Sequence, residues 1–151
     1  MAATIDIPQM YNATNHFIDR HAGKTSGARV AYTDHTGDWT YQKLAAMVNQ
    51  AGHVLSNLGL KAEQRMLMCM TDSVWFPAVF WGAIKIGAVP VPVNTMLTDA
   101  DYAYMLNDSC ARVLVVSESL YPKFVPHIDA QSSLGEVVID GSGTDGRPSL
   151  S

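Results

Sequence analysis

Apolar residues between positions 41 and 58 recur at the spacing of one helix face. They are Leu44, Val48, Ala51, Leu55 and Leu58. Successive members are three or four residues apart, as one stripe of an amphipathic helix requires. Thr40 precedes the stripe as an N-cap, and Gly59 follows it as a C-terminal stop. The pattern predicts a helix that packs one side on a core.

After position 60, continuous apolar runs alternate with segments of helical character. Because the apolar positions in each run are consecutive, the runs predict strands that are covered on both faces. We expect strands at 66–70, 112–117 and 136–140, and a further one at 89–93. We expect helices at 72–86, 98–107 and, with a break, 121–130. Strands that alternate with helices predict a mainly parallel sheet flanked by helices.

Two of these helices have recognisable start signals. Asp72 or Ser73 precedes the first as a cap, and Thr98 with Asp101 forms a capping box at the second, with Asp in place of Glu. The first helix carries the large apolar residues Trp75, Phe76, Phe80, Trp81 and Ile84. These side chains leave it little polar surface, so we expect it to be largely buried.

The chain before position 41 predicts a short helix and a hairpin. The helix runs over about 14–21 and ends before Gly23. Residues 29–34 and 38–41 flank the turn signal at 35–37 and have strand character. The expected fold class is therefore α/β, with a mainly parallel sheet flanked by helices and a short N-terminal hairpin.

Residues 74–93 also have the length of a membrane-spanning helix, with Lys85 as their only charge. Three prolines interrupt the run, and its last five residues alternate in a way that suits a strand. A buried helix followed by a strand is the better interpretation. Pro90 and Pro92 remove donors from the same side of that strand, which predicts an edge position in the sheet.

The composition is that of one folded domain. Of the 151 residues, 48% are hydrophobic and 16% are charged, which suffices for a core and argues against disorder. The net charge of −4 gives no electrostatic support for binding nucleic acid. The first residues lack the basic and apolar regions of a signal peptide. Cys69 and Cys110 are expected to be reduced and buried.

Motifs worked out from the residues alone assign neither a catalytic residue nor a metal ligand. Gly23-Lys24-Thr25 has the ending of a Walker A loop, but Ile18 occupies the position of its first glycine. The histidines at 16, 21, 35, 53 and 127 lack the spacing of metal ligands. We expect them at the surface or in the core.

Two blocks in the first half of the chain resemble a known enzyme family. The segment Trp39-Thr-Tyr-Gln-Lys-Leu44 resembles the first core motif of the AMP-forming adenylating enzymes, the superfamily of acyl-CoA ligases and luciferases. Trp39 and Lys43 depart from that motif. Leu58 to Met70 resembles the family block that follows it, in which an acidic residue precedes a strand.

The next blocks follow in the order that the family has. Phe80 to Asn94 resembles the second core motif. Asn94 to Leu106 is particularly similar to benzoate-CoA ligases and their aryl-CoA ligase relatives. The likeness covers about Thr14 to Asp140, which is most of the chain.

The resemblance implies a two-step reaction. A carboxylate attacks the α-phosphate of ATP to give an acyl-adenylate and pyrophosphate, and the thiol of coenzyme A (CoA) then displaces AMP. It implies ATP, Mg²⁺ and CoA as cofactors and an aromatic carboxylate as substrate. From the residues themselves, the cysteines favour a cytoplasmic location, and the net charge and the interrupted apolar run argue against nucleic acid and membrane as partners. The family's catalytic groups come after the region seen here. No catalytic residue is therefore assigned within 1–151, and no cofactor is expected to bind this chain tightly.

In relatives, the second core motif lies near the CoA channel. Lys85 is the first candidate for a contact with a CoA phosphate, and Asn94 and Lys123 are weaker candidates. For each of them the alternative is a solvated or structural role.

Residues 142–149 resemble the family's Ser/Thr/Gly-rich phosphate loop, which ends in Gly-x-Pro-Lys. Ser149 stands where the family has its lysine, and Asp145 places a negative charge where phosphate would lie. We therefore expect 1–140 to be the N-terminal α/β subdomain of an adenylating-enzyme fold. Residues 141–151 are expected to be a flexible linker or a truncated tail.

Two functional hypotheses follow. In the first, the chain is the N-terminal fragment of an aromatic acid-CoA ligase and is inactive by itself. In the second, it is a complete small α/β binding or interaction module without catalytic activity. For the isolated chain, the apolar load of 74–93 predicts self-association into a homo-oligomer or a larger assembly.

Overall fold

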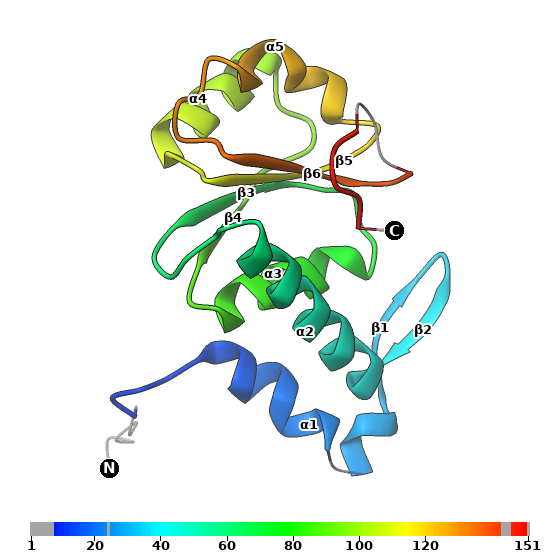
Figure 1. The fold of residues 1–151 in the computed structure, drawn as a ribbon. Helices are drawn as coiled ribbons and strands as arrows, with labels where there is room; N and C mark the ends of the chain where they lie inside the picture. Colours follow the sequence, from blue (N-terminus) through cyan, green and yellow to red (C-terminus); the bar gives the residue numbers. More distant parts are fainter. Residues whose placement is uncertain (1–7, 24, 143–145, 151) are drawn as a thin grey trace, which may run out of the picture.

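The computed structural model describes residues 8–23, 25–142 and 146–150, and it has the α/β fold that the sequence predicts. Figure 1 shows a central sheet with helices on both faces. One face carries α2 (Tyr41–Asn57) and α3 (Trp75–Lys85). The other carries α4 (Asp99–Ser109) and α5 (Val125–Ile128). A helical N-terminal segment packs on the outer side of α2 and α3.

This N-terminal segment confirms the helix predicted at 14–21. It consists of a π-helical turn, η1 (Asn15–Asp19), which continues into α1 (Arg20–Ala22). A 3-10 turn, η2 (Thr25–Ala28), leads on to the hairpin.

The predicted hairpin is formed by β1 (Val30–Asp34) and β2 (Gly37–Thr40), which pair antiparallel. Gly37 has a φ of 126°, a conformation that side chains disfavour, and it permits the tight connection. Thr40 then begins α2. Its side chain accepts a hydrogen bond from the Lys43 N–H, which confirms the predicted cap.

Four strands form a parallel sheet in the order β4-β3-β5-β6. They are β3 (Arg65–Cys69), β4 (Val89–Pro92), β5 (Val113–Ser117) and β6 (Glu136–Asp140). In β3, Met66 and Met68 pack toward α2 and α3, whereas Leu67 and Cys69 pack toward α4 and α5. Successive side chains of a strand point to opposite faces, so a strand covered on both faces needs a continuous apolar run.

β4 lies at an edge of the sheet, as its prolines predict. The Val89 N–H donates to the Gln64 carbonyl, on the side of β3. Pro90 and Pro92 occupy the alternate positions, so their nitrogen atoms face away from β3. The prolines therefore remove donors from the outer edge and disfavour the addition of another strand there.

The start of α3 differs from the predicted one. Val74 occupies the N-cap position, in place of Asp72 or Ser73, and its side chain makes no cap. The Val74 N–H donates to the Asp34 carboxylate at 2.8 Å, so the hairpin supplies a partner from 40 residues earlier in the chain. Ser73 Oγ accepts from the Trp75 N–H at 3.3 Å. The predicted Asp72 cap is wrong because a distant carboxylate satisfies the free donor at the helix end.

α3 packs on α2 through its small residues. Its buried residues are Ala78, Val79, Gly82 and Ala83. Its aromatic residues are only partly buried, and they are Trp75, Phe76, Phe80 and Trp81. No residue of α3 is exposed, so the expectation of a largely buried helix is confirmed, with its aromatic side chains less deeply buried than its small ones. Segment 74–93 is a helix followed by a strand, and no helix in the described residues is long and apolar enough to cross a membrane.

The second half of the chain follows its prediction closely. The capping box of Thr98 and Asp101 begins α4. The predicted broken helix is the 3-10 turn η3 (Tyr121–Lys123), followed by α5. Cys69 is buried as expected, but Cys110 is exposed, which corrects the expectation of two buried thiols. Cys110 ends α4 in a left-handed conformation with a φ of 48°.

Described residues of the tail contact the outer edge of β6. The Ile139 N–H donates to the Pro148 carbonyl at 2.9 Å, and the Leu150 N–H donates to the Ile139 carbonyl at 3.0 Å. Leu150 also packs against the core between the sheet and the α2–α3 pair. The domain boundary expected at Asp140 stays a prediction.

Candidate functional site

The three residues selected from the sequence do not form one site. Lys85 ends α3, on the face of the sheet that carries α2. Asn94 follows β4, Lys123 ends η3, and both contact Tyr102 of α4 on the opposite face. The chain therefore contains two separate groups, a Lys85 group and a Tyr102 group.

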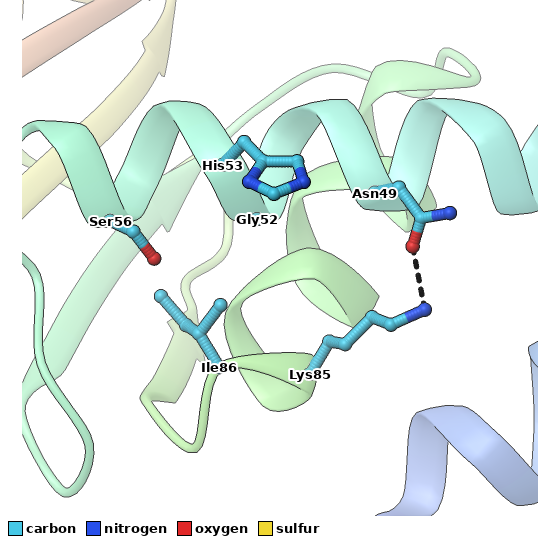
Figure 2. A pocket seen from close by; sticks show the side chains of 6 residues that line it. All are labelled: Asn49, Gly52, His53, Ser56, Lys85 and Ile86. Atoms are coloured by element: carbon cyan, nitrogen blue, oxygen red, sulfur yellow. Dashed lines mark hydrogen bonds between the residues drawn. The ribbon is translucent and has the colours of Figure 1, made fainter.

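The Lys85 ammonium is held by side chains from two other helical segments. Nζ lies 2.9 and 2.8 Å from the two carboxylate oxygens of Asp19. It also donates to Asn49 Oδ1 at 2.6 Å, as Figure 2 shows. A cavity of about 260 Å³ adjoins these atoms between α2 and α3. Its lining residues are Asn49, Gly52, His53, Ser56, Lys85 and Ile86. Because Asp19 already pairs with the ammonium, an anion that approached Lys85 would have to compete with that carboxylate.

The N-terminal segment also satisfies the end of α3. Asn12 Nδ2 donates to the Ile84 and Lys85 carbonyls at 3.0 and 3.2 Å. Carbonyls of the last helical turn lack partners within the helix, so these bonds supply them. Thr14, which is fully buried, donates through Oγ1 to the Trp81 carbonyl at 2.8 Å. In this geometry Lys85 ties the N-terminal segment to the α2–α3 pair.

Tyr102 is fully buried, and its hydroxyl joins α4 to the loop that follows β4. The hydroxyl donates to the Asn94 carbonyl at 2.9 Å and accepts from the Leu97 N–H at 3.3 Å. Lys123 Nζ lies 5.7 Å from the centre of the Tyr102 ring and donates to the Leu97 carbonyl at 3.4 Å. Within the loop, Asn94 Oδ1 accepts from the Met96 N–H at 2.8 Å. Tyr102 and Lys123 thus hold residues 94–97 in one conformation.

Burial sets the protonation state of the Tyr102 group. Burial, together with the neighbouring Cys69, raises the pKa of Tyr102 to about 12. Burial also raises the pKa of the Cys69 thiol. Both groups are therefore neutral near pH 7, and neither has the ionised form that a nucleophile requires.

A further polar cluster, which the sequence analysis missed, lies where β3, β5 and β6 end. The Thr71 N–H donates to Ser117 Oγ at 2.9 Å, and the Ser117 hydroxyl donates to Asp140 Oδ2 at 3.1 Å. Burial raises the pKa of Asp140, although the bond from Ser117 opposes the shift. The chain leaves β3 toward one edge of the sheet and β5 toward the other, and ligands of open α/β sheets bind at such a point. The signal that marks these residues in the sequence is their position at the carboxyl ends of predicted strands.

Residues of the tail contact this end of the sheet. The Ser142 N–H and hydroxyl donate to the Glu118 carboxylate at 3.2 and 3.1 Å. Ser149, at the position of the family's lysine, donates through its hydroxyl to the Gly141 carbonyl. Asp145, which argued against a phosphate loop, lies outside the described residues. The described part of the tail thus bonds to the protein's own groups at the carboxyl end of the sheet.

The Lys85 group, the Tyr102 group and the polar cluster at the carboxyl end of the sheet all hold segments of the chain in place. Within the described ranges, no three residues of His, Cys, Asp or Glu gather in a group that could hold a metal ion. Hydroxyls, amides and one internal ion pair can position a loop or contact a ligand.

Comparison with known proteins places the chain in a family. A family model described as AMP-binding enzyme matches residues 18–148. A benzoate–CoA ligase of Thauera aromatica is 43% identical over 148 residues, which make up 97% of this chain and 28% of that protein.

Solved structures with the same fold come from related ligases. A benzoate CoA ligase from Burkholderia xenovorans matches with a TM-score of 0.82 and 30% identity, over 93% of this chain and 27% of that one. The anthranilate CoA ligase AuaEII, in complex with anthranoyl-AMP, matches with a TM-score of 0.85 and 27% identity, over 89% of this chain and 26% of that one. The chain thus spans about a quarter of the length of these relatives. With a family match over most of its length and a relative 43% identical, the chain belongs to the AMP-binding enzyme family.

Proposed function

We propose that the chain is the N-terminal part of an AMP-forming ligase that joins an aromatic carboxylate to CoA, with benzoate as the first substrate to test. The observation that carries the proposal is the 43% identity to a benzoate–CoA ligase, which extends over 97% of the chain. The structural likeness to a benzoate ligase and to an anthranilate ligase supports the same substrate class.

In the proposed reaction the carboxylate attacks the α-phosphate of ATP and pyrophosphate leaves. The CoA thiol then attacks the acyl carbon, and AMP leaves. Mg²⁺ bound with ATP neutralises charge on the phosphates. The described residues of this chain contribute structure: Tyr102 and Lys123 hold the loop after β4, and Lys85 holds the N-terminal segment. The proposal includes a cytoplasmic location, where ATP and CoA are available.

The proposal also includes inactivity of residues 1–151 by themselves. Each tenfold loss in rate corresponds to about 1.4 kcal/mol of barrier, and the groups that act on the phosphates normally supply many such factors. The test compares the product of the longest reading frame that contains the chain with the 151-residue chain. Both are assayed for benzoate-dependent exchange of pyrophosphate into ATP and for formation of benzoyl-CoA.

We expect exchange and thioester formation with the longer product and neither with the chain alone. If the longer product activates no aromatic carboxylate, or if the frame ends with this chain, the ligase proposal is wrong. Benzoate-dependent exchange that stays with the repurified chain would instead disprove the inactivity of residues 1–151.

Contact with CoA remains a proposal for Lys85, Asn94 and Lys123. Asn94 and Lys123 meet at one loop, whereas Lys85 is paired with Asp19, so Lys123 is the better first target. In the longer product, Lys123→Met should raise KM for CoA by about 5- to 100-fold, because one charge-assisted hydrogen bond is lost. Pyrophosphate exchange should stay unchanged. Lys61→Met removes an exposed charge elsewhere and serves as the control. Equal damage to both half-reactions would point to a structural role for Lys123.

We further propose that the isolated chain self-associates through the aromatic side of α3. Its aromatic residues are only partly buried, and the proline-blocked edge of β4 is a poorer partner for a second chain. Sedimentation over a range of chain concentrations tests this. A constant monomer mass up to the highest concentration would exclude self-association.

A further inference from the structure

A pocket of about 290 Å³ lies on the N-terminal segment, and no step proposed above uses it. Its lining residues are Met10, Tyr11, Asn12, Asn15, His16 and Arg20. We call it the Arg20 pocket. It combines an apolar and aromatic wall with a guanidinium group.

Among the described residues, no carboxylate pairs with the charge of Arg20. Its Nε donates to His21 Nε2 at 3.0 Å, and its Nη1 lies 3.1 Å from His16 Nε2. A guanidinium can only donate, so these contacts use its N–H groups. The one ion pair within the described ranges is that of Lys85 with Asp19, which engages the carboxylate next to Arg20 in the chain. Within the part of the chain that the structure describes, no bond engages Nη2, so it can donate to an anion.

The backbone brings a carboxamide to the same pocket. In η1 the Arg20 N–H donates to the Asn15 carbonyl, which is the i to i+5 bond of a π-helical turn. In an α-helix, residue i+5 would be rotated by about 140° from residue i, whereas the wider π-turn reduces that rotation. Asn15 and Arg20 consequently line one pocket. Such turns are rare and occur frequently at functional sites.

The remaining wall is aromatic and open to water. The rings of Tyr11 and His16 lie 6.0 Å apart, and those of His16 and Phe17 lie 4.9 Å apart. Phe17 in turn contacts Trp81 of α3 at 5.7 Å. Tyr11 is 50% exposed and Met10 is 92% exposed. A planar apolar group can cover these side chains with favourable ring contacts.

We propose that the Arg20 pocket binds a small aromatic carboxylate. The carboxylate pairs with the guanidinium of Arg20, since such pairs are among the strongest hydrogen-bonded contacts in proteins. Asn15 supplies a further donor from the same side. The aromatic ring lies against Tyr11 and Met10. Asp19 of the same segment holds Lys85, so a bound ligand stabilises the docking of this segment on α3.

The test is an NMR titration of the 151-residue chain with benzoate, observed at backbone amides of residues 10–20. A ligand of this size with one charged contact is expected to bind with a Kd of roughly 1 mM. Benzamide lacks the charge and acetate lacks the ring, and each should bind at least about tenfold more weakly. Arg20→Gln and Tyr11→Ala should each weaken benzoate binding by about tenfold or more, whereas Lys61→Gln, which removes an exposed charge, should not.

The amide spectrum of each variant is first compared with that of the original chain, and if one variant does not fold, the other decides. Benzoate shifts that persist in both variants, that map away from residues 10–20, or that benzamide or acetate reproduces at equal concentration would overturn the proposal. The titration contains neither ATP nor CoA, so its outcome does not depend on the ligase activity.

Discussion

Gly82 offers a sharp test of the packing between α2 and α3. A Cβ atom added to Gly82 would lie 2.9 Å from Gly52 N, 3.0 Å from the Val48 carbonyl oxygen and 3.0 Å from Ala51 Cβ. Two of these neighbours are backbone atoms that cannot rotate away, so Gly82→Ala must push the helices apart. Gly52→Ala is the matched control: its Cβ would lie 3.3 Å from the Gly82 carbonyl oxygen and 3.4 Å from Ile86 Cγ2.

The expected magnitudes follow from two opposing effects. Overpacking a tight site costs about 1–3 kcal/mol, and the short backbone contacts place Gly82→Ala in the upper part of that range. Replacing glycine by alanine inside a helix stabilises by about 1 kcal/mol. Gly82→Ala should therefore lower the free energy of unfolding by about 1–2 kcal/mol, and Gly52→Ala should leave it nearly unchanged.

Urea unfolding followed by tryptophan fluorescence measures both changes. The slope against urea concentration should be the same for the original chain and both variants, because the surface exposed on unfolding is the same. If Gly82→Ala is as stable as the original chain, or if the two variants lose equal stability, the helices do not meet as closely as these distances indicate.

Three further predictions concern Asp34, Tyr102 and Lys85. Hydrogen bonds, chiefly from a threonine hydroxyl in the hairpin turn, hold the pKa of Asp34 well below its usual range. The ionised carboxylate therefore stabilises the fold fully above about pH 4, and this stabilisation is lost as the pH falls further. The difference in free energy of unfolding between the original chain and Asp34→Asn should shrink in acid, and urea unfolding at several pH values measures it. Tyr102→Phe should lower the free energy of unfolding by about 1–2 kcal/mol near pH 7, and it should speed hydrogen exchange at the Leu97 N–H. Unchanged exchange at that amide would contradict this prediction. Since the pKa of Tyr102 is raised to about 12, the original chain, unlike the variant, should lose this stabilisation above about pH 10. A double-mutant cycle of Lys85→Met with Asp19→Asn should give a coupling of about 0.5–1 kcal/mol, and no coupling would mean that the ion pair adds no stability.

Most of the fold could be predicted because its signals are local. The capping box of Thr98 and Asp101 needs only residues three apart, and it begins α4 as predicted. The prolines of β4 predict an edge strand because proline has no backbone N–H, so the side of the strand that it faces cannot pair fully with a neighbour. The start of α3 escaped prediction because its partner, Asp34, lies 40 residues earlier in the chain.

The candidate site could be predicted less well. Lys85 stands out in the sequence as a lone charge in an apolar segment, but its acceptor Asp19 is 66 residues away. Nothing in the sequence links Asn94 to Lys123, whereas in the structure Tyr102 brings them to one loop. Charge and hydrogen-bond partners depend on contacts between distant segments, which a local pattern does not contain.

By itself the sequence determined the order of strands and helices, the parallel sheet and the family. These follow from the period of apolar residues and from motif spacing, which act over a few neighbouring residues. The tertiary structure alone decided which helix surfaces are buried, as at Gly82, and which charges are paired, as at Lys85. The physical reason is that packing and ion pairing depend on distances in space, and those distances are set only when segments far apart in the chain come together.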